Sequence, residues 1–175
     1  MDLQLNNKRA LVTGSTAGIG FAIARQLATE GADVIINGRD NARVQAAVAR
    51  IKAEFPLAQV SGIAADLANA KGIAAMTAAV KKVDILVNNL GIFEPKPFEK
   101  IPDEDWLRFF EVNVMSGVRL ARHYLPQMKA TNWGRIVFIS SESGICPPAE
   151  MVHYGMTKSA QLSVSRGLAE TCVGT

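Results

Sequence analysis

Cysteine, aromatic residues, long apolar runs and blocks of like charge are scarce in this 175-residue sequence. Its two cysteines, Cys146 and Cys172, are too few for a disulfide framework and lack metal-ligand spacing, so we expect reduced thiols and no metal site. Its 19 basic and 16 acidic residues are interspersed, which argues against nucleic-acid binding despite a net charge of +3. Residues 1–9 lack the apolar core of a signal peptide, and no stretch is long enough to span a bilayer. We therefore expect a cytoplasmic protein that contacts neither nucleic acid nor membrane.

The sequence does contain enough apolar residues for a sizeable core. Because 49% of its residues are hydrophobic and 20% are charged, we expect one domain over residues 1–175. Short runs rich in Val and Ile alternate with longer stretches of helical periodicity, which predicts an α/β fold, a Rossmann-like, doubly wound parallel sheet with helices on both faces. The expected strands are 9–13, 33–37, 59–64, 84–88 and 135–140, and the expected helices are 18–30, 41–54, 69–80, 103–128 and 154–172.

A glycine-rich turn follows the first expected strand and leads directly into a helix. Glycines at this place permit a tight turn and let the backbone approach a pyrophosphate, whose charge the helix N-terminus attracts. The spacing differs from the usual G-x-G-x-x-G fingerprint, and an ordinary glycine-rich connection is the alternative. The residues predicted to bind the cofactor here are Gly14, Ser15, Thr16, Gly18, Ile19 and Gly20.

The residues after the second expected strand indicate which dinucleotide binds. A carboxylate at this place contacts a free ribose 2′-hydroxyl, whereas a basic residue accommodates a 2′-phosphate. Gly38 occupies the position of the carboxylate and Arg39 follows it, which predicts NADP(H), with NAD(H) as the second possibility. The alternative interpretation makes Arg39 a solvated loop residue, and we expect Asp40 to cap the next helix in either case.

Tyr154 and Lys158 are four residues apart, so on a helix their side chains share one face. A nearby cation favours the phenolate and lowers the pKa of a tyrosine, which would allow Tyr154 to exchange a proton near neutral pH. On its own the pair is also typical of an exposed helix surface.

Taken together, the motifs resemble those of the short-chain dehydrogenase/reductase family. The resemblance covers the chain from Lys8 onward and rests on T-G-x-x-x-G-I-G at 13–20, N-N-x-G at 88–91, Asn113, I-S-S at 139–141, Tyr154 and Lys158. It implies a carbonyl reductase or alcohol dehydrogenase that transfers hydride to or from NADP(H).

The resemblance also implies roles for individual catalytic residues. Tyr154 would donate a proton to a substrate carbonyl or accept one from an alcohol. Lys158 would lower the pKa of Tyr154 and bind the nicotinamide ribose. Ser141, thirteen residues before the tyrosine, would hydrogen-bond the reacting oxygen, and Asn113 would hold a proton-relay water near Lys158.

Further cofactor contacts are implied after the third and fourth strands. Asp66 and Leu67 match the position that contacts adenine, Asn89 and Gly91 lie in the N-N-x-G motif, and Asn88 matches a residue that steadies the sheet. For Asp66 and Asn88, turn formation and strand-end capping are equally good interpretations.

The sequence departs from the family pattern at two places. Leu90 stands where alanine is usual in N-N-A-G, and nothing after Thr175 corresponds to the family's substrate-covering segment. Without that segment the strand 135–140 would be an open sheet edge, and we name no substrate beyond a small carbonyl or alcohol. The alternative function is a non-catalytic nucleotide-binding or assembly fragment; a Rossmann-like methyltransferase would not require Tyr154 and Lys158.

Three other aromatic or imidazole groups are interpreted without catalytic roles. His153 points about 100° away from Tyr154 and is expected at the start of the helix. Trp106 and the pair 109–110 are expected to pack in the core or against another subunit. The resemblance implies a homodimer or homotetramer built through these helices.

Overall fold

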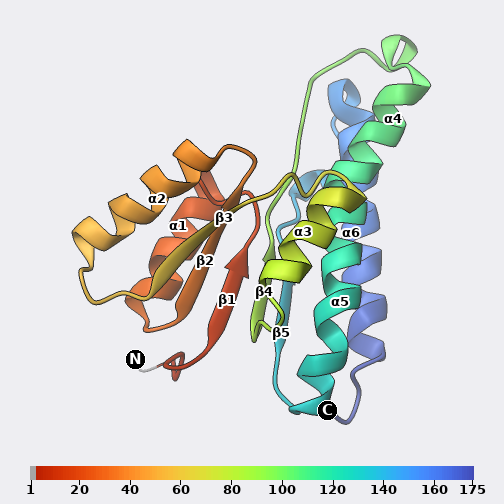
Figure 1. The fold of residues 1–175 in the computed structure, drawn as a ribbon. Helices are drawn as coiled ribbons and strands as arrows, with labels where there is room; N and C mark the ends of the chain where they lie inside the picture. Colours follow the sequence, from red (N-terminus) through yellow and green to blue (C-terminus); the bar gives the residue numbers. More distant parts are fainter. Residues whose placement is uncertain (1–2) are drawn as a thin grey trace.

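The computed structural model describes residues 3–175, and five parallel strands form its central sheet in the order β3-β2-β1-β4-β5 (Figure 1). The strands are β1 (Arg9–Val12), β2 (Asp33–Gly38), β3 (Val60–Ala64), β4 (Ile85–Asn88) and β5 (Arg135–Phe138). β1 pairs with β2 on one side and with β4 on the other, with Ala10 opposite Val34 and Ile85. The α/β fold class is therefore confirmed.

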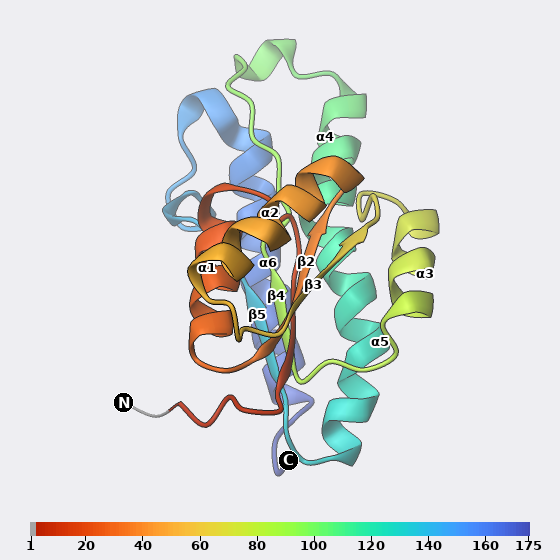
Figure 2. The same ribbon diagram turned by 60° about the vertical axis from the view of Figure 1, so that its left-hand side comes forward.

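Helices cover both faces of the sheet, as Figures 1 and 2 show. Ala10 and Val12 of β1 lie in a core cluster with residues of α1 and α2, whereas Leu11 lies in a second cluster with residues of α3 and α5. Alternate side chains of a strand point to opposite faces, so a strand buried on both faces must be apolar throughout. The helices are α1 (Gly18–Thr29), α2 (Asn41–Glu54), α3 (Ala70–Ala79), α4 (Asp103–Phe110), α5 (Ser116–Ala130) and α6 (Val152–Glu170).

The order of the strands creates a switch point between β1 and β4. From β1 the chain winds outward through β2 to β3, then returns across the sheet to β4 and β5. In open α/β sheets ligands bind beyond the carboxyl ends of the strands at such a point. The glycine-rich turn after β1 and the N-N-x-G motif after β4 both lie there.

The prediction of a single helix over 103–128 is wrong in one respect. The structure divides it into α4, a π-helical segment (Glu111–Met115) and α5. A π segment shifts the helical periodicity, but over the five residues Glu111–Met115 this shift is too short to be detected from the sequence pattern. The segment buries Val112, Asn113 and Val114, which places a predicted site residue in its centre.

The other expected helices agree with the structure within two residues at each end. Asp40 caps α2, as expected, because its side chain accepts a hydrogen bond from the Arg43 amide at 2.8 Å. Asn69, expected as the first helical residue, instead caps α3 by accepting from the Gly72 amide at 2.9 Å. Short 3-10 turns that the sequence analysis did not anticipate lie at Phe98–Lys100, Glu142–Gly144 and Ala149–Met151.

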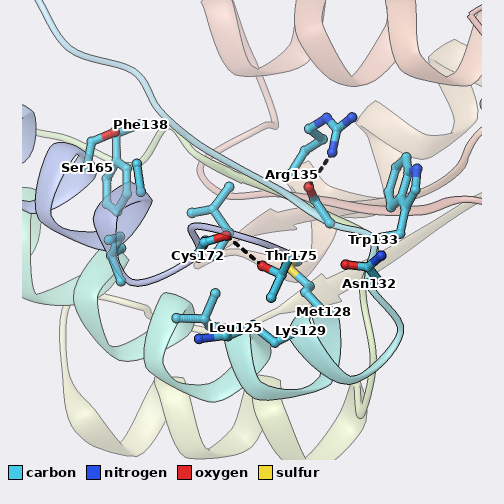
Figure 3. A pocket seen from close by; sticks show the side chains of 14 residues that line it. Leu125, Met128, Lys129, Asn132, Trp133, Arg135, Phe138, Ser165, Cys172 and Thr175 are labelled. Atoms are coloured by element: carbon cyan, nitrogen blue, oxygen red, sulfur yellow. Dashed lines mark hydrogen bonds between the residues drawn. The ribbon is translucent and has the colours of Figure 1, made fainter.

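The outer side of β5 is open in the part of the chain that the structure describes. β5 pairs only with β4 there, and Val137 is 42% exposed. Beside this edge, a groove of about 230 Å³ lies between β5, α5 and α6 (Figure 3). Its walls include Leu125, Met128, Trp133, Phe138, Leu168 and Cys172. The expected open edge is thus observed.

No helix in the range 3–175 combines the length and apolar character that crossing a membrane requires.

Candidate active site

The glycine-rich turn requires glycine for two physical reasons, a positive φ angle and the close approach of neighbouring atoms. Gly14 and Gly18 have φ angles of +59° and +58°, in the left-handed region that disfavours a side chain. Gly20 is required by close approach instead, because a Cβ there would lie 2.4 Å from Asn89 Nδ2 and 2.7 Å from Gly14 O. These positions let the backbone curl tightly over the carboxyl end of β1.

Buried polar side chains hold the turn in place. The Ser15 amide donates to Asn37 O at 2.8 Å, and its hydroxyl donates to Val12 O at 2.6 Å and accepts from the Asn37 amide at 3.0 Å. Asn89 Nδ2 donates to the carbonyls of Thr13 and Gly14 at 2.9 and 3.0 Å. Ser15 and Asn89 therefore shape the turn, and both hydrogen-bond donors of Ser15 are engaged within the protein.

Asn37 is an anchor that sequence reasoning missed. It is 2% exposed, and its Nδ2 donates to Ile63 O and Ala65 O at 3.2 and 3.1 Å while its Oδ1 accepts from the Gly14 amide at 3.3 Å. One side chain thereby connects the ends of β2 and β3 to the glycine turn. The only available signal was a polar residue at the end of an otherwise apolar strand.

The N-terminus of α1 is left without a side-chain cap. Its N-cap residue is Ala17, which makes no side-chain hydrogen bond, whereas α2 and α3 are capped by Asp40 and Asn69. The first amides of a helix have no partner within the helix, so those of Gly18, Ile19 and Gly20 point outward as donors. The side chain of Ile19 is 67% exposed. This end of α1 has the chemistry that binds a phosphate.

A cleft of about 360 Å³ opens beyond the carboxyl ends of the strands beside this helix end. Thr16, Arg39, Leu67 and Gly91, all predicted to bind the cofactor, line it. The other lining residues are Gly14, Ala17, Asn37, Gly38, Asp40, Arg43, Ala65 and Leu90. Leu90, the departure from N-N-A-G, therefore forms part of the wall.

Two arginines stand at the β2 end of this cleft. Arg39 and Arg43 both line it and both are exposed. A Cβ at Gly38 would lie 2.6 Å from Thr16 Cγ2. Thr16 therefore occupies the space beside Arg39 in which an acidic side chain at position 38 would lie. Arg43 was missed by sequence reasoning, although its place in the first turn of the expected helix, four residues after Arg39, was a usable signal.

Asp66 stabilises the turn after β3, which was one of the two roles expected for it beside contact with adenine. Its Oδ1 accepts from the Ala68 amide at 3.2 Å, and its Oδ2 accepts from Asn69 Nδ2 at 3.0 Å. The neighbouring Leu67 is 1% exposed and reaches the cleft.

Tyr154 and Lys158 lie together on α6. Lys158 Nζ is 5.5 Å from the centre of the Tyr154 ring. Lys158 is 5% exposed, and its ammonium donates to Ile139 O at 2.7 Å and to Gln161 Oε1 at 3.1 Å. Burial lowers the pKa of Lys158 from its usual range, because the low-dielectric surroundings disfavour the charged form. Two of its three N–H groups are bound by the protein, and one remains for a ligand.

Asn113 connects the loop after β4 to the start of α6. Its Oδ1 accepts from the Ile92 amide at 2.8 Å, and its Nδ2 donates to Ile92 O at 2.9 Å and to Thr157 Oγ1 at 3.0 Å. The Thr157 hydroxyl in turn donates to Tyr154 O at 2.7 Å. Thr157 is fully buried and was missed, since a threonine inside a helix carries no local signal of this contact.

Ser141 lies at the carboxyl end of β5, where it caps the following 3-10 turn. Its hydroxyl donates to Ser143 Oγ and accepts from the Ser143 amide, both at 3.2 Å. This turn packs closely on α6, because a Cβ at Gly155 would lie only 2.9 Å from Ser143 O. On another side of the site, the exposed Phe93 ring meets the Tyr154 ring edge-on, with ring centres 6.3 Å apart.

Gly91 joins the two halves of the site. It lines the cleft, and a Cβ on it would lie 3.5 Å from Asn113 Oδ1 and 3.8 Å from Lys158 Nζ. Gly91 therefore lies between the cleft beside the glycine turn and the Lys158 ammonium that faces Tyr154. Residues far apart in the sequence come close to one another around it.

His153 is the second residue of α6 and lies in an aromatic cluster away from this cleft. It is fully buried, its ring centre is 4.1 Å from that of Phe109 and 6.0 Å from that of Trp106, and neither ring nitrogen has a hydrogen-bond partner. Burial lowers the pKa of His153, which favours the neutral ring. The packing interpretation of Phe109 is confirmed, since it is fully buried.

A doubly wound sheet with a glycine turn at its switch point, and with the half-buried Tyr154 and the buried Lys158 side by side on α6, defines a Rossmann-type fold. A family model described as short chain dehydrogenase matches residues 8–174, and the chain belongs to this family. The uncharacterized oxidoreductase YvaG of Bacillus subtilis is 53% identical over 175 residues, which are 100% of this chain and 66% of the relative. The D-beta-hydroxybutyrate dehydrogenase of Cupriavidus necator is 39% identical over 158 residues, 88% of this chain and 60% of that protein.

Solved structures agree with this assignment. The L-sorbose reductase of Gluconobacter frateurii, complexed with NADPH and L-sorbose, matches with a TM-score of 0.91 and 33% identity over 99% of this chain and 67% of the reductase. A 3-oxoacyl (acyl-carrier-protein) reductase of Agrobacterium tumefaciens C58 with NADP bound matches with a TM-score of 0.89 and 34% identity over 97% of this chain and 66% of that chain. The chain thus spans about two thirds of the length of these proteins.

Proposed function

We propose that the protein is an NADP(H)-dependent oxidoreductase that interconverts a small carbonyl compound and the corresponding alcohol. The observation that carries this proposal is the place of Gly91 between the cleft and Lys158. That residue lines the cleft beside the glycine turn, and a Cβ added to it would lie 3.8 Å from Lys158 Nζ. A dinucleotide lying in the cleft would therefore end beside the Tyr154–Lys158 pair.

The residues present fit a phosphorylated dinucleotide. The uncapped amides of α1 suit the pyrophosphate, and Leu67 and Leu90 offer apolar walls to the adenine. Arg39 and Arg43 can donate to a 2′-phosphate, while Gly38 leaves no carboxylate to repel it. NADPH, when bound, supplies the hydride. This preference agrees with the NADPH- and NADP-bound neighbours described above.

The protein's own groups would then manage the proton. Lys158, held against Ile139 O and Gln161 Oε1, presents a positive charge to Tyr154 and keeps one N–H for the nicotinamide ribose. Tyr154 would pass a proton to a carbonyl oxygen or accept one from an alcohol. Ser141 would donate to the same oxygen once its hydroxyl turns away from Ser143.

The test is the substitution Tyr154→Phe, which removes the phenolic hydroxyl and keeps the ring that packs against Phe93. We expect carbonyl-dependent oxidation of NADPH to fall by at least about 10³-fold, because the proton has no donor, while the dissociation constant for NADPH changes little. Turnover is followed by loss of NADPH absorbance over a panel of ketones and aldehydes, and binding by thermal shift. Retained turnover in Tyr154→Phe would contradict the assigned mechanism.

A second candidate is a nucleotide-binding unit without catalysis. It is favoured by the contact of the Ser141 hydroxyl, which donates to Ser143 Oγ at 3.2 Å within the protein. Protection by NADPH with no turnover of any carbonyl in the wild-type chain would support it. Protection by neither NADPH nor NADH would contradict both candidates.

We also propose that the protein forms a homodimer or homotetramer through α4, α5 and α6. Leu107 and Phe110 of α4 are 70% and 39% exposed, and Leu162 of α6 is 41% exposed. Large apolar side chains exposed near one another on helices are typical of contacts between subunits.

A further inference from the structure

Gln161 is a buried side chain of the site to which no role has been assigned so far. It lies on α6, three residues after Lys158, and is 1% exposed. Its Nε2 donates to the backbone carbonyl of Asn113 at 2.6 Å, and its Oε1 accepts from Lys158 Nζ at 3.1 Å. One amide group therefore spans the distance between two predicted catalytic residues.

The orientation of this amide is fixed by its partners. A carbonyl can only accept and an ammonium can only donate, so the NH₂ group must face Asn113 and the oxygen must face Lys158. The opposite orientation would place oxygen against oxygen and NH₂ against NH₃⁺. Each buried polar atom of Gln161 thus has the partner that its chemistry requires, and the dipole of the amide points its negative end at the ammonium.

This dipole matters because Lys158 has little else to keep it charged. No Asp or Glu in the described part of the chain forms an ion pair with Lys158. Burial lowers its pKa, and its acceptors are the Ile139 carbonyl and the Gln161 oxygen. The ring of Tyr154, 5.5 Å away, is the titratable group that faces it. Hydrogen bonds to the charged form are therefore what opposes desolvation.

We propose that Gln161 is a positioning residue, which holds the Lys158 ammonium charged and in place opposite Tyr154 by connecting it to the Asn113 carbonyl. This inference rests on the proposed function, in which the charge on Lys158 activates Tyr154. Gln161 itself touches neither substrate nor cofactor in this assignment. It acts through Lys158, whose third N–H stays free toward the cleft.

The contact between Gln161 and Asn113 also involves the π-helical segment Glu111–Met115. Asn113 lies in the centre of that segment, and its carbonyl accepts the Gln161 amide across 48 residues of sequence. π segments are frequent at functional sites because they change the direction of individual carbonyl and side-chain groups within a helix. A side chain thereby makes the connection for which the family resemblance implied a water. The second lone pair of the Asn113 carbonyl stays available for such a water.

The experiment follows the ionisation of Lys158 directly, by ¹³C NMR of the protein labelled at lysine Cε, in the wild type and in Gln161→Met. Methionine has a similar length and no strong acceptor, so we expect Lys158 to lose its proton at a lower pH than in the wild type. Ser163→Ala is the matched control, since Ser163 is exposed on the same helix two residues away. Lys158→Met identifies the signal by removing it.

A second variant separates positioning from packing. Gln161→Glu loses the donor to Asn113 O but keeps an acceptor toward Lys158 with more negative charge, so we expect Lys158 to stay protonated to a higher pH than in the wild type. Opposite displacements in the Met and Glu variants support the proposal. If Gln161→Met does not fold, Gln161→Glu alone carries the test. An unchanged Lys158 titration in a folded variant, judged by circular dichroism, overturns the proposal.

The NMR measurement needs no turnover, so its outcome is independent of the proposed function. Where the wild type reduces a carbonyl with NADPH, we expect kcat to fall about tenfold in Gln161→Met, the loss of roughly one hydrogen bond to a charged group. The pH dependence of kcat should move with it, which a purely structural change would not cause. Absence of turnover in the wild type would contradict the proposed function. The NMR titration of Lys158 would still decide whether Gln161 keeps Lys158 charged.

Discussion

At the scale of single residues, the site depends on polar groups whose partners lie far away in the sequence. Asn37, Asn89, Asn113 and Gln161 are buried or half-buried amides, and each fixes backbone from a different strand or helix. A buried amide without partners costs about 1–3 kcal/mol, so these contacts are specific as well as stabilising. The exposed Arg39 and Arg43 line the cleft and are not part of this amide network.

The exposed arginines predict the cofactor preference. We expect Arg39→Ala and Arg43→Ala each to raise the dissociation constant for NADPH about tenfold, because each loses a charge-assisted hydrogen bond to the 2′-phosphate, and to leave that for NADH nearly unchanged. Fluorescence titration with both cofactors measures this. Arg50→Ala is the matched control, because Arg50 lies on α2 with Arg43 but does not line the cleft. Equal losses for NADPH and NADH would contradict a 2′-phosphate site.

At the scale of elements, α6 carries Tyr154 and Lys158, and α3 and α5 pack against the same core cluster as Leu168 of α6. Tyr124 of α5 is fully buried, and its hydroxyl donates to Val80 O at the end of α3 at 2.9 Å. Burial raises the pKa of Tyr124 to about 12. The phenol therefore stays neutral in the folded protein well above the pH at which it ionises in the unfolded chain.

This difference predicts a loss of stability in alkali. A raised pKa in the folded state means that the contribution of Tyr124 is complete below about pH 10 and is lost as the pH rises through about 12, amounting to about 3 kcal/mol. In Tyr124→Phe we expect a free energy of unfolding lower by about 1 kcal/mol at neutral pH and a smaller further loss in alkali. Urea denaturation at both pH values measures this.

The control for that comparison is Tyr154→Phe, because these are the two tyrosines of the chain. Its unfolding should keep the wild-type loss between pH 10 and 12. An identical alkaline loss in Tyr124→Phe and the wild type would contradict the assignment to Tyr124.

At the scale of the whole molecule, the two core clusters lie on opposite faces of one sheet, and the site occupies its carboxyl edge. β5 ends the described sheet, and Phe138 of this strand lines the groove in Figure 3. α4 and α6 leave large apolar side chains exposed, Leu107 and Leu162 among them. These side chains are the basis of the proposed association of the chain with copies of itself.

Light scattering tests this association. We expect a mass of two or four chains for the wild type, and a shift toward one chain in Leu107→Asp, because a charge placed in an apolar contact is costly to desolvate. Leu57→Asp, at a 93% exposed position outside those helices, is the control and should keep the wild-type mass. A single-chain mass for the wild type would contradict the proposal.

Much of the fold was accessible from sequence because its signals are local. Near-continuous apolar runs predicted β1, β2, β4 and β5, and β3 was predicted as well although its sequence is less apolar. Helical periodicity, with the capping residue Asp40, placed α1, α2, α3 and α6 within two residues. The Tyr154–Lys158 pair was equally accessible, since both residues lie on one helix and spacing alone puts them on one face. The roles predicted for these residues remain predictions that the experiments above address.

Only the tertiary structure decided how the pieces meet. The π segment within 103–128, the place of Gly91 between cleft and ammonium, and the amide of Gln161 between Asn113 and Lys158 each depend on packing between distant elements. Sequence spacing describes neighbours along a strand or helix, whereas contacts across many residues follow from how the faces pack. The sequence by itself determined the fold class and the motifs; the packed structure decided which buried groups face the reacting pair.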